Sequence, residues 1–137
     1  MKPLSRIAAL SPIQRRLLAR SLARVAWFRV ALRMHSVASI LRRIELRAGA
    51  GPANFTPRDA AWAVHAAARR LPGTYCLARS LALHELLRRS GFDSELRIGV
   101  ARSGPGIAAH AWVECDGVAL ESGTATTAFA SLGDLPR

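Results

Sequence analysis

The sequence has few of the features that mark a disulfide-stabilised or exported protein. Only two cysteines, Cys76 and Cys115, occur among 137 residues. One pair cannot form the several cross-links that stabilise small secreted domains. No apolar run is followed by a small-residue cleavage site, so the start of the chain does not resemble a secretory signal. We therefore expect a cytoplasmic protein with reduced thiols.

Acidic residues are scarce in the first third of the chain. Residues 1–50 contain eleven basic side chains and a single acid, Glu45, whereas residues 51–137 contain nine basic and eight acidic side chains. The net charge of +11 therefore belongs almost entirely to the N-terminal segment. Few aromatic residues accompany these basic ones and no nucleic-acid-binding motif occurs, so we expect no nucleic-acid partner.

The basic segment also lacks an uninterrupted apolar run of about 20 residues, which a membrane span requires. A Ser-Pro-Ile-Gln capping box at 11–14 predicts a helix that runs to about Met34. Apolar residues spaced by three and four predict a second helix over 37–44, with Ser36 as its N-cap. The simplest interpretation is that both helices pack on a core with their arginines in solvent. An amphipathic helix of this kind also suits a membrane surface or an acidic partner.

Half of the residues are apolar, which is enough for one domain with its own core. The clearest break is the Gly- and Pro-containing stretch at 49–54. It divides a basic helical segment, 1–50, from a core region, 51–137, within one compact domain. Thr56 caps a helix that runs to about residue 71. Thr74 caps the next helix, which ends before a glycine at 91.

After that glycine the pattern changes from helical to alternating. Strands are predicted over 94–101 and 107–115, and the Asp116-Gly117 dipeptide predicts a hairpin to a returning strand over 118–122. The remaining tail is expected to be a short strand or coil. Helices followed by an antiparallel sheet indicate an α+β fold.

Cys76 lies in the first turn of its predicted helix, at the second helical position if Thr74 is the N-cap. The helix dipole stabilises a thiolate there, and the Cys76 main-chain N–H is one of the unpaired donors that could form part of an oxyanion hole. A nucleophile also needs a base. His84 is about 12 Å along the same helix, too far to take the proton. His110, in the middle of a strand, is the remaining candidate.

Strand pairing then suggests an acid to orient His110. A two-residue turn at 116–117 places Glu121 on the same face as His110 and Trp112, diagonal to His110 at about 7–8 Å. Asp116 is a weaker candidate because it lies in the turn, about 20 Å from His110 along the strand. Trp112 would form a wall of the site.

Each of these residues also has a simpler interpretation. A lone cysteine or a histidine in a strand more often packs in a core than catalyses a reaction. A metal site is disfavoured because the cysteines and histidines show no paired ligand spacing, and Cys115 points away from His110. The catalytic interpretation depends on the combination of a cysteine at a helix start, a histidine strand and a following strand that carries an acid.

Two segments, RRLPGTYCLARSLALHELLRRSGFDSELRIGVA and AHAWVECDGVALESG, closely resemble a known family. This is the transglutaminase-like cysteine peptidase domain of lasso-peptide biosynthesis, the B protein that removes the leader from a ribosomally made precursor. The resemblance covers about residues 57–123. Its motif positions are Arg70, Pro72, Cys76, Leu77, Ala82, Leu83, Leu86, Leu87, His110, Ala111, Trp112, Val113, Glu114, Asp116 and Gly117.

The resemblance implies a papain-like arrangement in which Cys76 is the nucleophile, His110 the base and the next strand supplies the acid. The family's acid is usually Asp, whereas this chain has Leu-Glu-Ser-Gly there, which makes Glu121 the candidate. No cofactor is implied. Fused members carry a winged-helix module, but this chain begins with helices. We therefore expect a stand-alone peptidase whose partners are the precursor peptide, a separate leader-binding protein and an ATP-dependent cyclase.

Two other functions remain open. The same three residues could transfer an acyl group to an amine, as transglutaminases do, because a triad does not fix the acceptor. Alternatively, the chain could be a non-catalytic adaptor that binds a membrane or an acidic partner through residues 1–50.

Overall fold

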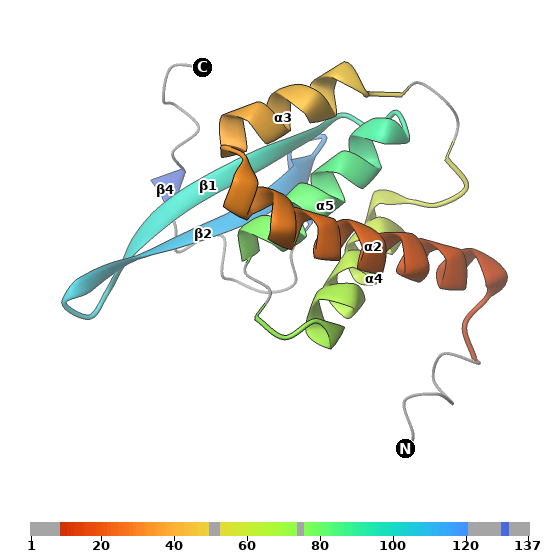
Figure 1. The fold of residues 1–137 in the computed structure, drawn as a ribbon, viewed down its shortest axis with the longest axis horizontal. Helices are drawn as coiled ribbons and strands as arrows, with labels where there is room; N and C mark the ends of the chain where they lie inside the picture. Colours follow the sequence, from red (N-terminus) through yellow and green to blue (C-terminus); the bar gives the residue numbers. More distant parts are fainter. Residues whose placement is uncertain (1–8, 50–52, 74–75, 121–129, 132–137) are drawn as a thin grey trace.

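Four helices precede a small antiparallel sheet in the computed structural model, which describes residues 9–49, 53–73, 76–120 and 130–131 (Figure 1). The helices are α2 (Pro12–Met34), α3 (Val37–Leu46), α4 (Pro57–Arg70) and α5 (Cys76–Arg89). The strands are β1 (Ser94–Ser103), β2 (Gly106–Cys115), β3 (Val118–Ala119) and β4 (Ala130–Ser131). This order confirms the predicted α+β class.

The helix starts follow their capping residues. Ser11 Oγ accepts from the Gln14 main-chain N–H at 3.2 Å, and the Gln14 side chain accepts from the Ser11 N–H at 2.9 Å. Thr56 and Asp59 make the same reciprocal pair at the start of α4. Each box satisfies two amide donors that a helix end otherwise leaves unpaired. Ser36 caps α3 by accepting from a main-chain amide, so the predicted caps at residues 11, 36 and 56 are confirmed.

Helix α5 ends as the sequence predicted. Gly91 has a φ of +86°, a conformation that glycine adopts without the steric cost that a side chain would add. The N–H of Phe92 reaches back to the Leu87 carbonyl at 3.0 Å, which satisfies one of the last carbonyls of the helix. The predicted cap at Thr74 lies outside the described residues.

The sheet has the order β3-β2-β1-β4. The turn at 116–117 pairs Cys115 with Val118 and Glu114 with Ala119, which is the predicted register. Strand β3 is shorter than predicted, although the Leu120 N–H still donates to the Val113 carbonyl at 2.9 Å. Strand β4, in the tail that was expected to be a short strand or coil, pairs with β1.

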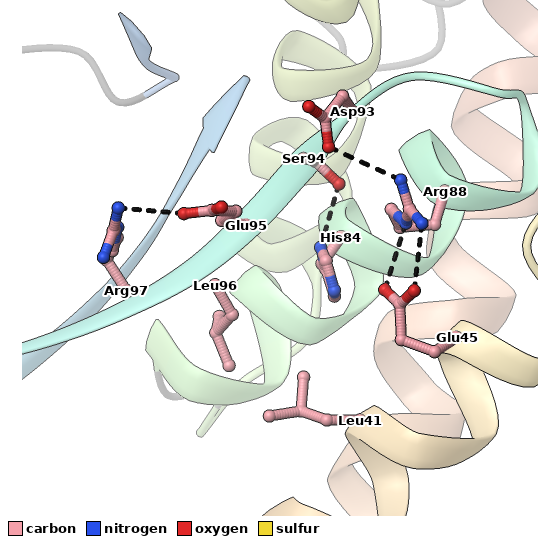
Figure 2. A pocket seen from close by; sticks show the side chains of 9 residues that line it. All are labelled: Leu41, Glu45, His84, Arg88, Asp93, Ser94, Glu95, Leu96 and Arg97. Carbon is pink, nitrogen blue, oxygen red and sulfur yellow. Dashed lines mark hydrogen bonds and ion pairs between the residues drawn. The ribbon is translucent and has the colours of Figure 1, made fainter. Parts of the chain in front are cut away.

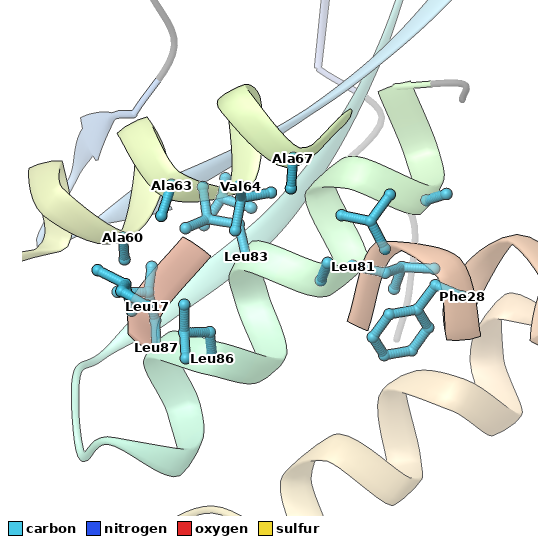
Figure 3. Close-up of a cluster of buried hydrophobic side chains, with 14 of the residues drawn as sticks. Leu17, Phe28, Ala60, Ala63, Val64, Ala67, Leu81, Leu83, Leu86 and Leu87 are labelled. Carbon is cyan, nitrogen blue, oxygen red and sulfur yellow. The ribbon is translucent and has the colours of Figure 1, made fainter. Parts of the chain in front are cut away.

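One hydrophobic core joins the helices to one face of the sheet (Figure 3). Leu81, Leu86 and Leu87 of α5 are fully buried in it. Helix α2 contributes Val25 and Phe28. Helix α4 contributes a run of small side chains, which lets its backbone approach the other helices closely. Removing a large side chain from such a core typically costs about 2–5 kcal/mol of stability.

Helix α5 lies at the centre of this arrangement and contacts α2, α3, α4, β1 and β2. The expectation that the arginines of the first helix face solvent is wrong for Arg24. Its side chain is only 14% exposed, and its Nε lies 2.9 Å from a carboxylate oxygen of Glu85 on α5. The basic helix is therefore joined to the core by charge as well as by apolar packing. None of the helices in the described ranges is long and apolar enough to cross a bilayer.

Candidate active site

Cys76 is the first residue of α5, and its side chain is half-buried. The first main-chain amides of a helix have no carbonyl partner within that helix, and the aligned peptide dipoles place partial positive charge there. Main-chain N–H groups at a helix start are, in general, donors to a developing negative charge. This helix end is therefore the candidate position of the nucleophile.

Two buried hydrogen bonds determine how α5 lies along the sheet. The Ser80 hydroxyl donates to the Ala111 carbonyl of β2 at 3.0 Å. One helical turn later, the Nδ1 atom of His84 lies 2.9 Å from the Ser94 hydroxyl, at the start of β1 and opposite the end of β2. Helix α5 therefore advances in the same direction as β2. Its first turn lies toward the part of β2 that contains His110.

The candidate nucleophile and base thus belong to two elements that pack directly together. Ser80 follows Cys76 by four residues, which is about one turn of helix. Ala111 follows His110 by one residue. The Ser80–Ala111 hydrogen bond therefore joins α5 to β2 close to both candidates.

His110 and Trp112 lie on one face of the sheet. Their ring centroids are 6.0 Å apart and the ring planes are inclined by only 20°, so the rings are stacked. Trp112 is 4% exposed. Val113 belongs to the core that includes the helices, so strand alternation places His110 on the opposite face. One side of the imidazole therefore faces the indole ring.

The two candidate acids have different positions. Glu121 lies outside the described residues. Asp116 is exposed in the β2–β3 turn, with a φ of +52°. Its main-chain N–H bonds to the Asp93 carbonyl at 3.3 Å, so the turn is tied to the start of β1. The geometry places Asp116 at the far end of β2 from His110.

A polar chain that the sequence did not predict runs beside the stacked rings. The Trp112 Nε1–H donates to Glu114 at 3.3 Å, and Arg97 Nε donates to the other oxygen of the same carboxylate at 3.1 Å. Arg97 is paired with Trp112 across the β1–β2 ladder. The glycine-containing turn near residue 104 is the signal in the sequence for this pairing, because residues equally distant from the turn on the two strands lie opposite each other. These two hydrogen bonds hold the indole ring in place, and His110 stacks against that ring.

His84 belongs to a different region, at the other end of α5 (Figure 2). The ring is buried and bonds to Ser94. The pKa of His84 is lowered to about 4, mainly by burial; the charge of Glu45 opposes the shift and that of Arg88 adds to it. A cavity of about 530 Å³ opens beside the ring, lined by Leu41 and by charged side chains of α3, α5 and β1. A neutral, hydrogen-bonded imidazole in this position holds α5 against β1.

Cys115 differs from Cys76 in its surroundings. It is buried at the end of β2, and burial, with smaller contributions from Asp116 and Asp93, raises the pKa of its thiol. Its strand position puts it on the opposite face from His110. Across the ranges that the structure describes, no three His, Cys, Asp or Glu side chains converge as a metal site would require.

Comparison with known protein families assigns the chain to a superfamily. The family model of the transglutaminase-like superfamily matches residues 18–133, which include most of α2 as well as the candidate cysteine and histidine. Searches against curated proteins and against solved structures give no significant match. Because the family model covers most of the sequence, from the basic helix to the last strand, the chain belongs to the transglutaminase-like superfamily, which includes cysteine peptidases.

Proposed function

We propose that this protein is a cysteine peptidase that removes the leader from a ribosomally made lasso-peptide precursor, with Cys76 as nucleophile and His110 as base. The observation that carries the proposal is the placement of Cys76 at the first residue of a helix that is bonded, one turn later, to the strand of His110. Membership of the transglutaminase-like superfamily supports the same chemistry. The restriction to lasso precursors depends on the resemblance of residues 57–123.

In the proposed reaction, His110 takes the proton of the Cys76 thiol, and the sulfur attacks the carbonyl carbon of the scissile peptide bond. The tetrahedral intermediate collapses to a thioester as His110 returns the proton to the leaving amine. Water, deprotonated by the same imidazole, then hydrolyses the thioester and frees the cysteine. The released amine is the N-terminus of the core peptide, which a separate ATP-dependent cyclase would use to close the ring.

The surroundings of the two residues suit this reaction. The Cys76 main-chain N–H would donate to the oxyanion, since the first amides of a helix lack intrahelical partners. Trp112 would keep water from one side of the imidazole, and Glu121 would orient the ring from the returning strand. His110 lies on the sheet face opposite the helical core, so the proposal requires its imidazole to reach Cys76 past the strand.

Replacement of Cys76 tests the nucleophile directly. In an assay with a lasso precursor and its leader-binding protein, Cys76→Ala should lower the rate of leader release by at least about 10³-fold, because the covalent route is lost. Cys115→Ala is the matched control and should retain most of the activity. Cleavage by Cys76→Ala at a rate close to that of the unchanged protein would disprove the mechanism.

The same experiment separates hydrolysis from transfer. If a primary amine is added, a peptidase still releases free carboxylate on the leader, whereas an acyl transferase gives the corresponding amide. Mass spectrometry of the leader distinguishes the products. Predominant amide would replace the peptidase assignment with a transglutaminase-type one, with the same catalytic residues.

We further propose that leader recognition comes from a separate winged-helix protein and that α2 offers a surface to it or to the cyclase. Trp27, Val30 and Met34 are exposed and lie three and four residues apart, so they form one stripe on α2. Hollows of about 160 and 240 Å³ flank Trp27 and are bordered by arginines of α2, α3 and α5 and by one acid, Glu85, which is paired with Arg24. An apolar stripe with a basic border suits an acidic, partly apolar partner surface.

This contact is best tested by surface substitution, because α2 also contributes to the core. Trp27→Glu should weaken binding of the leader-binding protein or the cyclase by about tenfold or more, measured by calorimetry with each purified partner. Arg16→Glu, at an exposed position nearer the start of the same helix, is the control for charge alone. Equal loss in both variants would show that charge, and not this stripe, controls binding. Binding of Trp27→Glu to both partners with unchanged affinity would contradict the proposed surface.

A further inference from the structure

The short connection between α4 and α5 is tied to the basic N-terminal helix. The Nη2 atom of Arg29, on α2, donates to the main-chain carbonyl of Pro72 at 2.6 Å, although the two residues are 43 positions apart in the sequence. Hydrogen bonds from a charged donor are stronger than those between neutral groups. This contact therefore fixes the connection from outside the two helices that it joins.

The neighbouring glycine shows how closely the guanidinium approaches the chain. Gly73 has a φ of +73°, and a Cβ atom built there would lie 3.6 Å from Nη2 of Arg29. The connection thus turns in a conformation that favours glycine, with the arginine head group against its main chain. Both the hydrogen bond and the packing locate this part of the backbone relative to α2.

Arg29 lies on a part of α2 whose backbone is held in place. Its neighbour Phe28 and the residue one turn earlier, Val25, are both buried in the core, so the backbone of α2 is held there. On the other side, the Ser80–Ala111 bond fixes α5 to β2. The start of α5 therefore lies between two anchors, one from the N-terminal helix and one from the sheet.

We propose that Arg29 is a positioning residue for Cys76. This inference deepens the proposed peptidase function and rests on it for its catalytic consequence. Pro72 precedes Cys76 by only four residues, so holding the Pro72 carbonyl limits how far the start of α5 can shift. A nucleophile displaced by about 1 Å can lose on the order of 100-fold in rate, which makes such an anchor important for turnover.

The proposal gives part of the basic segment a role within the site. Arg29 would contribute through main-chain geometry and would not touch the substrate. Loss of the anchor should therefore lower kcat and leave KM nearly unchanged, because binding contacts persist while the attacking sulfur is misplaced.

The test compares Arg29→Met with Arg29→Lys and with Arg33→Met, all in the full chain. Arg33 is exposed one turn further along the same helix, so its replacement removes the same charge without touching Pro72. Hydrogen exchange of the peptide that spans residues 71–77 reports on the connection without any assay of cleavage. We expect exchange there to accelerate about tenfold in Arg29→Met, with α4 amides unaffected. Arg29→Lys keeps a charge and a donor and should restore part of the protection.

Kinetics on the precursor supply the second measurement. Arg29→Met should lose about tenfold or more in kcat, Arg29→Lys less, and Arg33→Met little. If Arg29→Met and Arg33→Met agree in both exchange and kcat, the positioning role is overturned. If exchange responds as expected but no variant, including the unchanged protein, cleaves a leader, the anchor stands and the proposed function fails. If Arg29→Met does not fold, the comparison of Arg29→Lys with Arg33→Lys decides the proposal by the same measurements.

Discussion

The two ends of α5 hold polar side chains in contrasting surroundings. At the C-terminal end, His84 bonds to Ser94, and Arg88 makes two contacts with Glu45, at 2.9 and 3.1 Å. These groups satisfy one another and hold the helix in place. At the N-terminal end, Cys76 is half-buried, and the dipole of the helix favours negative charge. The proposed chemistry thus belongs to one end, and the polar groups at the other end serve stability.

Replacement of the two histidines tests most directly whether the two ends of α5 have different roles. His110→Gln should lower the rate of leader release by about 10²–10⁴-fold, the usual contribution of a general base, while the melting temperature changes little. His84→Gln should leave kcat almost unaffected. Steady-state kinetics on both variants provide the measurement. A larger kcat loss in His84→Gln than in His110→Gln would reverse the assignment of the two ends.

Thiol reactivity compares the two cysteines without an activity assay. Cys76 lies half-exposed at a helix start, whereas burial of Cys115 both blocks access and raises the pKa of its thiol. Iodoacetamide at neutral pH should therefore label Cys76 faster than Cys115 by on the order of 100-fold, followed by peptide mass spectrometry. Equally slow labelling of the two cysteines would favour a non-catalytic adaptor over an enzyme.

The pH dependence of stability should report the buried end of α5. Burial lowers the pKa of His84 to about 4 from an ordinary value of 6.5, so the unfolded chain binds its proton more readily. The contribution of His84 is complete above about pH 6.5 and is lost as the pH falls toward 4, by up to about 3 kcal/mol in total. Urea unfolding at pH 7.5, 6 and 5 should show a flatter profile for His84→Gln. Parallel profiles for the two proteins would contradict this account.

The ion pair at the surface of the same end should matter least. Glu45 has a side chain that is 56% exposed, so water screens its attraction to Arg88. Glu45→Gln should cost less than about 1 kcal/mol in the free energy of unfolding and should weaken further with added salt. A loss of several kcal/mol, measured by urea unfolding, would show that this pair is a principal support of the helix.

Local signals in the sequence predicted most of the fold. The capping residues at 11, 36 and 56 and the hairpin at Asp116-Gly117 each specify structure within a few residues, and the structure follows them. Candidate residues such as Cys76 and His110 could be chosen because helix starts and strand faces depend on the same local patterns.

Contacts between distant segments could not be predicted in this way. The bonds Ser80–Ala111 and Arg29–Pro72 join residues 31 and 43 positions apart, and no local preference for helix or strand encodes such a pairing. Arg24 illustrates the same difficulty, because a helical arginine that seemed suited to solvent meets Glu85 of α5. The catalytic triad stays a prediction, and its candidate acid, Glu121, lies outside the described residues.

The separation in sequence between the residues that make these contacts has a consequence for how the protein folds. The β1–β2 hairpin closes around a two-residue turn, and each helix forms from neighbouring residues, so these elements can appear early. The bonds beside Cys76 require segments that are far apart in the chain to meet, and closing such loops costs more entropy and takes longer. During refolding, native secondary structure should therefore return before Cys76, the candidate nucleophile, is correctly placed. Newly made chains would pass through a stage that has helices and a hairpin but lacks the arrangement that the proposed reaction needs.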